Sequence, residues 1–80
     1  MEPETIKDIV RDILVNQETL SRGIKKRDSL EYSQALVSRW EQEYRKQHGG
    51  LPYWYDAEMW WNTCYLLSEE LDAKKDVGEV

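Results

Sequence analysis

The chain of 80 residues has little of what most catalytic and metal sites require. It contains one cysteine, one histidine, four glycines and no phenylalanine. A single cysteine excludes a disulfide within the chain and a thiolate cluster that could hold zinc. The glycines form none of the patterns of a phosphate-binding loop, a dinucleotide fingerprint or a nucleophile elbow. We therefore expect no enzymatic activity, no metal and no cofactor.

Long hydrophobic runs are also missing. No apolar run approaches the ~20 residues that a helix needs to span a bilayer, and charged residues make up 34% of the chain. The first residues, Met1 to Glu4, are acidic and lack the basic start and apolar run of a secretory signal. These absences predict a cytoplasmic protein that does not enter a membrane.

Positive charge is scarce overall but locally concentrated. The net charge of −5 disfavours general affinity for nucleic acid, because phosphate binding needs a local excess of cations. One basic segment runs against this balance and consists of Arg22, Lys25, Lys26 and Arg27. These cations either occupy a solvated helix end, where they suit the macrodipole, or contact phosphate or an acidic partner. The helix-end interpretation is the favoured one.

Apolar residues recur at steps of three and four, which is typical of amphipathic helices. The first helix is predicted over residues 3–25, with a stripe that comprises Ile6, Val10, Ile13, Gln17, Leu20 and Ile24. Gly23 either ends this helix or is tolerated within it. Gln17 is the polar exception in the stripe, and it either fixes the register of a coiled coil or faces the helix edge.

Capping residues indicate a second helix over residues 29–47. Asp28 can cap its start, and Glu31, three positions later, can bond back in the arrangement of a capping box. The pair Gly49 and Gly50 relieves the steric cost of a left-handed stop at its end.

A third helix is predicted over residues 56–74, with Asp56 as its cap. Three helices with short connections indicate an all-α fold, a compact three-helix bundle in which residues 1–74 form a single domain. Residues 75–80 lack apolar periodicity, so we expect a flexible, disordered tail there.

What the chain does contain is a concentration of tryptophan and tyrosine. Eight of its nine aromatic residues fall between residues 40 and 65. Three of them lie on predicted helical stripes and are assigned to the core, namely Trp40, Tyr44 and Trp60. Cys64 shares the core face of the third helix, and we expect it to be a small buried hydrophobe rather than a nucleophile.

Five aromatic residues lie off those stripes, in the apolar connector before the third helix and on a flank of that helix: Tyr53, Trp54, Tyr55, Trp61 and Tyr65. A bundle of this size can bury only some of them. Trp and Tyr are also the residues enriched at the centres of protein interfaces. We predict that these five residues, together with Glu58, form a partner-binding surface.

The leading hypothesis is a non-enzymatic protein–protein interaction module, a small acidic helical regulator or inhibitor. A partner with a basic surface is expected, because acidic residues at positions 41, 43, 56 and 58 surround the aromatic segment. Viral and mobile-element genomes encode many proteins of this kind, and such an origin is expected by analogy of class alone.

Two alternatives stay open. A homo-oligomeric structural or assembly protein would bury the aromatic face or the first-helix stripe between identical subunits. A nucleic-acid-binding protein would contact phosphates with the basic segment 22–27 and stack its aromatic side chains on bases. The net acidity makes nucleic-acid binding the weaker of the two.

Overall fold

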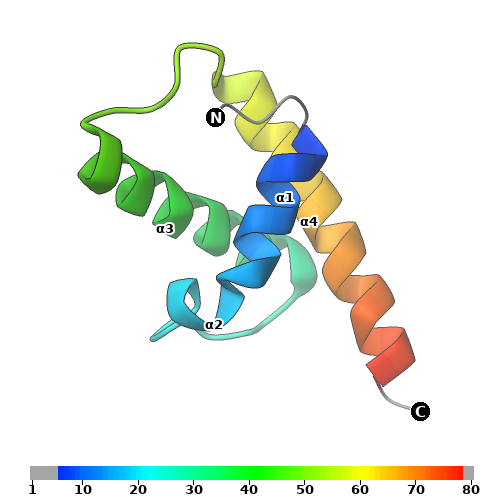
Figure 1. The fold of residues 1–80 in the computed structure, drawn as a ribbon. Helices are drawn as coiled ribbons and strands as arrows, with labels where there is room; N and C mark the ends of the chain where they lie inside the picture. Colours follow the sequence, from blue (N-terminus) through cyan, green and yellow to red (C-terminus); the bar gives the residue numbers. More distant parts are fainter. Residues whose placement is uncertain (1–5, 79–80) are drawn as a thin grey trace.

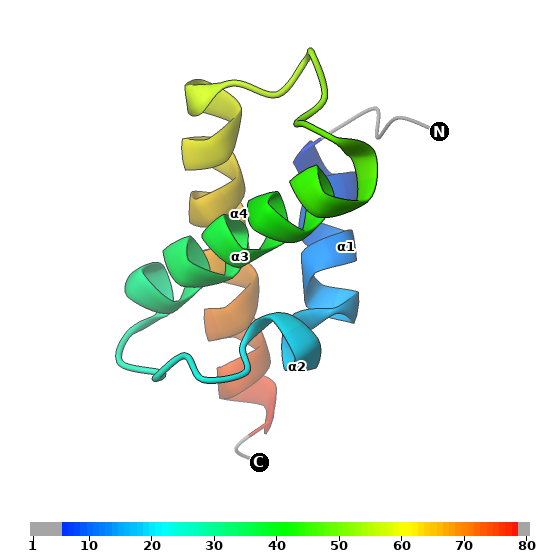
Figure 2. The same cartoon turned by 90° about the vertical axis from the view of Figure 1, so that its left-hand side faces the viewer.

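The computed structural model describes the backbone of residues 6–78 and the side chains of residues 6–74. Four helices make up this part of the chain: α1 (Ile6–Val15), α2 (Gln17–Leu20), α3 (Ser29–His48) and α4 (Ala57–Gly78). No strand occurs between residues 6 and 78, so the predicted all-α fold is confirmed. Helices α1 and α4 lie side by side, and α3 lies across both of them (Figures 1 and 2).

The predicted first helix is divided in two. Its first residues, 3–5, lie outside the described part of the chain. Helix α1 ends at Val15, and the side chain of Asn16 donates a hydrogen bond to the backbone oxygen of Asp12 at 2.9 Å. Such a local bond competes with regular helix and favours a break. Gly23 has a left-handed φ of 84°, which turns the chain away after α2 and makes this glycine a stop rather than an interior residue.

Helix α3 begins and ends close to where its capping residues predict. The carboxylate of Asp28 accepts a hydrogen bond from the backbone N–H of Glu31 at 2.9 Å, which satisfies one of the unpaired donors of the first turn. At the other end, Gly49 adopts a left-handed φ of 79°, and its N–H donates to the carbonyl of Arg45 at 2.7 Å. Both ends are therefore closed by contacts between neighbours in sequence.

Helix α4 starts as predicted but ends later. The carboxylate of Asp56 caps it by accepting from the N–H of Met59 at 2.9 Å. The helix continues through residues 75–78 to Gly78, beyond the predicted end at residue 74, and the flexibility of the tail stays a prediction. Their sequence has no proline or glycine before residue 78, so nothing breaks the helix there. Residues 79–80 lie outside the described part.

The core lies between α1, α3 and α4. Its buried apolar side chains are Ile9, Val10, Ile13, Leu20, Tyr32, Leu36, Val37, Trp40, Tyr55, Cys64 and Leu67. The apolar stripe of α1 is thus covered within the same chain. Gln17 is half-buried and its amide donates to the Tyr32 hydroxyl at 3.4 Å, which agrees with the helix-edge interpretation. Within residues 6–78, no helix combines the length and hydropathy needed to cross a bilayer.

Trp40 connects α3 to α1 inside this core, as predicted for a core residue. Its indole N–H donates to the Oδ2 atom of Asp12 at 2.6 Å. A buried indole needs such a partner, because it gives up its hydrogen bond to water on folding. The Trp40 ring also packs against Tyr44 and Tyr55, with ring centroids 5.2 Å and 5.6 Å apart. These contacts hold the connector between α3 and α4 against α3.

Candidate interaction surface

The structure separates the nine aromatic residues by burial. Two of those predicted for the core, Tyr44 and Trp60, are half-buried and pack against it. Tyr44 also contacts the ring of His48, with centroids 4.2 Å apart. The exposed aromatic residues among residues 6–74 are Tyr53, Trp61 and Tyr65.

Of the five residues predicted for the surface, Tyr55 is buried instead, at only 8% exposed. Trp54 is half-buried, with its indole nitrogen covered. The connector folds back through a turn in which the N–H of Tyr55 donates to the carbonyl of Pro52 at 3.0 Å. This turn directs Tyr55 onto Trp40. Helical periodicity could not reveal it, because the connector is not helical.

Helix α4 carries the exposed aromatic pair. Trp61 is 53% exposed and Tyr65 is 61% exposed. They lie one turn apart, and Glu58 precedes Trp61 by three positions, so the three side chains share one side of the helix. We call Glu58, Trp61 and Tyr65 the α4 aromatic face. Tyr53 is 88% exposed but belongs to the connector rather than to α4.

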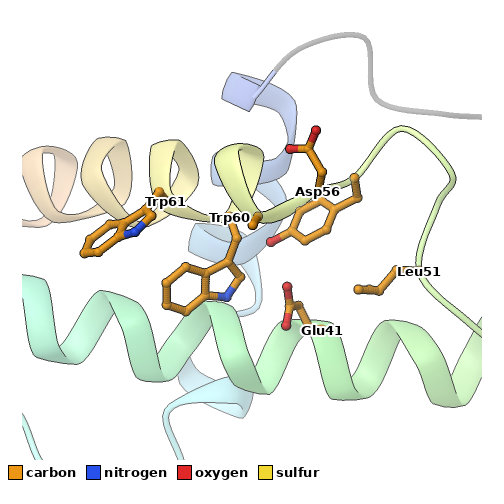
Figure 3. Close-up of a pocket in the computed structure, with 7 residues that line it drawn as sticks. Glu41, Leu51, Asp56, Trp60 and Trp61 are labelled. Atoms are coloured by element: carbon orange, nitrogen blue, oxygen red, sulfur yellow. The ribbon is translucent and has the colours of Figure 1, made fainter.

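An open pocket of about 470 Å³ lies between α3, the connector and the start of α4 (Figure 3). We call it the aromatic pocket, and the residues that line it are Glu41, Leu51, Tyr55, Asp56, Ala57, Trp60 and Trp61. Trp60 and Trp61 extend from α4 toward α3, and Glu41 extends from α3 in the opposite direction (Figure 3). The two indole rings are 5.8 Å apart and nearly perpendicular, at 73°.

Glu41 gives this pocket a negative charge. Its side chain is half-buried, and no ion pair within residues 6–74 involves it. The hydroxyl of Tyr55 is buried beside the Glu41 carboxylate. Burial, and then the charge of nearby Glu41, raise the pKa of Tyr55. The pocket therefore combines aromatic walls with oxygen atoms that can accept hydrogen bonds.

Cys64 is fully buried behind this site. Burial, followed by the charge of Glu41, raises the pKa of its thiol to about 12. The thiol is therefore protonated near neutral pH, and a protonated thiol is a poor nucleophile. Within residues 6–74, no group of three His, Cys, Asp or Glu side chains is placed to hold a metal ion.

The basic segment lies elsewhere. Its residues Arg22, Lys25, Lys26 and Arg27 are all exposed. They follow α2 and lead into the start of α3, so they do not cap a regular helix end. The Lys26 ammonium is 5.3 Å from the centroid of the Tyr32 ring, a cation–π contact within the chain. The connector between α3 and α4 lies at the other end of α3 (Figure 2).

Comparison of the chain with known protein families, curated proteins and solved structures finds no match. The surface itself is therefore the basis for assigning a function.

Sequence reasoning missed the aromatic pocket. It placed Glu41 among the acidic residues around the aromatic segment and Trp60 in the core, whereas both residues line one hollow. The tandem Trp60-Trp61 lies near the start of a capped helix, but the sequence does not indicate which residue of α3 faces it. That pairing depends on how α3 crosses α4.

Proposed function

We propose that this chain is a non-enzymatic protein–protein interaction module, a small acidic helical regulator or inhibitor that binds its partner through the α4 aromatic face. The observation that supports it best is the pair Trp61 and Tyr65, which remain largely exposed on a helix whose other side is fully buried at Cys64 and Leu67. The core is complete without them, so their apolar area is left for contact with another molecule.

The chemistry of the face suits a protein partner. Trp and Tyr supply large rigid contact areas and one polar group each, which makes them frequent energetic centres of interfaces. Half-buried Trp60 adjoins Trp61 and extends the apolar surface toward the aromatic pocket. Glu58 on the same face and Glu41 in the pocket favour a partner that presents positive charge.

Affinity capture from the native host, with the recovered proteins quantified, tests this proposal. Trp61→Ala and Tyr65→Ala are each expected to lower recovery of the specific partner by more than about tenfold, as truncation of central Trp and Tyr anchors does. Both residues are exposed, so helical circular dichroism should not change.

Val15→Ala is the matched control, because Val15 is 78% exposed on α1 and its loss removes apolar surface away from α4. Recovery with this variant should equal that of the unchanged chain. A partner that is captured equally well by Trp61→Ala and Tyr65→Ala would contradict the proposal.

A further inference from the structure

We propose that the aromatic pocket receives the guanidinium group of an arginine presented by the partner protein. The inference rests on the proposed function, because it specifies what the partner inserts beside the α4 aromatic face. Trp61 belongs to both the pocket and that face, so one partner segment can contact both.

The walls of the pocket suit a flat cation. Trp60 and Trp61 offer indole surfaces from α4, and Tyr55 adds a phenol ring from the connector. The face of an aromatic ring carries partial negative charge and attracts cations, most strongly for Trp. A guanidinium is planar and weakly hydrated, so it can stack on such rings at a low desolvation cost.

The negative charge of the pocket favours a cationic ligand over a neutral one. Glu41 is half-buried there with no ion pair within residues 6–74. Asp56 lies at the rim, where one of its oxygens already caps α4. A carboxylate that faces a hollow lined by aromatic rings forms strong, charge-assisted bonds with a guanidinium, which can donate two parallel N–H groups to it.

The shape and the donors of a guanidinium distinguish it from other cations. The Tyr55 hydroxyl is buried beside Glu41, so the carboxylate oxygens are the acceptors that the pocket offers. A guanidinium brings five N–H donors and no acceptor. A trimethylated ammonium has no donor at all. The ammonium of lysine is a compact, strongly hydrated charge that does not stack.

Titration of the whole chain with N-acetyl-arginine methylamide, followed by NMR, tests the inference without the natural partner. We expect saturable shifts of the indole N–H signals of Trp60 and Trp61. The neutral citrulline analogue should cause none, and the lysine and trimethyl-lysine analogues should bind more weakly than arginine.

Variants then locate the binding site. Glu41→Gln should weaken arginine binding about tenfold or more, because it removes a charge-assisted bond. Glu43→Gln is the matched control with the same change in net charge, since Glu43 lies outside the pocket and contacts Lys46 at 3.9 Å. It should leave binding unchanged. Trp61→Ala, at an exposed position that cannot unfold the core, should also weaken binding.

Tyr65→Ala separates the inference from the proposed function. Tyr65 belongs to the α4 aromatic face but not to the pocket, so this variant should lose the partner and keep arginine binding. The inference is overturned by the absence of saturable shifts, by equal binding of the citrulline analogue, by tighter binding of either lysine analogue, or by equal losses in Glu41→Gln and Glu43→Gln. Each of these outcomes leaves the capture experiment to stand or fall separately.

Discussion

Glu41 acts on both sides of its position in α3. Toward solvent it supplies charge to the aromatic pocket, and toward the core it raises the pKa of Tyr55 and Cys64, for both of which burial is the larger cause. Neither effect is visible in the sequence around residue 41, because both groups lie more than ten positions away along the chain. Single residues here acquire their properties from neighbours on other elements.

The raised pKa of Cys64 predicts a loss of stability in alkali. Below pH 9.0, the ordinary pKa of the thiol, it is protonated in both the folded and unfolded states. Between pH 9.0 and about 12 the unfolded state releases this proton and the folded state does not, so the free energy of unfolding falls as pH rises. Tyr55, whose pKa is raised too, acts in the same direction.

Urea unfolding followed by circular dichroism across this pH range measures the effect. Cys64→Ala should reduce the steepness of the decline, even though the variant is less stable throughout because of the atom it removes from the core. A decline of the same steepness in Cys64→Ala would show that the thiol is not the group responsible.

At the scale of the elements, local signals placed the helix ends well where they involve a cap or a left-handed stop. The start of α3 follows from Asp28 and its end from Gly49, whose contacts reach only three or four residues along the chain. The division between α1 and α2 at Asn16 was not predicted, because the apolar stripe continues across the break.

The two adjacent glycines after α3 give a direct test of the stop. Gly49→Ala should lower the free energy of unfolding by about 1–2 kcal/mol, because a side chain at a left-handed φ is strained. Gly50→Ala is its control, since Gly50 has no left-handed φ and an added Cβ would meet no atom within 4 Å. It should change stability by less than about 0.5 kcal/mol. Equal losses of stability in Gly49→Ala and Gly50→Ala, measured by urea unfolding, would show that the left-handed φ of Gly49 is not what ends α3.

At the scale of the whole molecule, burial decides which surface is left for a partner. The stripe of α1 is covered by α3 and α4, so it is not available for assembly of identical subunits in this fold. The exposed apolar side chains of α4 remain. None of the basic residues Arg22, Lys25, Lys26 and Arg27 lines the aromatic pocket.

We therefore expect the isolated chain to be a monomer of 9.6 kDa. Its α4 aromatic face would then stay exposed until a different protein binds it. Light scattering across a wide range of protein concentration measures this mass. A dimer that Tyr65→Glu dissociates would instead favour the homo-oligomeric alternative, since that substitution places a charge in the centre of the face.

The helical class, the approximate extent of α3, the cap of α4 and the core positions of Trp40 and Cys64 all follow from the order of residues. They depend on periodicity and on hydrogen bonds between close neighbours, and both are local. Burial of Tyr55 and the placement of Glu41 and Trp60 in one pocket depend on how α3 crosses α4 and where the connector packs. These contacts join residues far apart in sequence, so folding of the whole chain is needed to establish them.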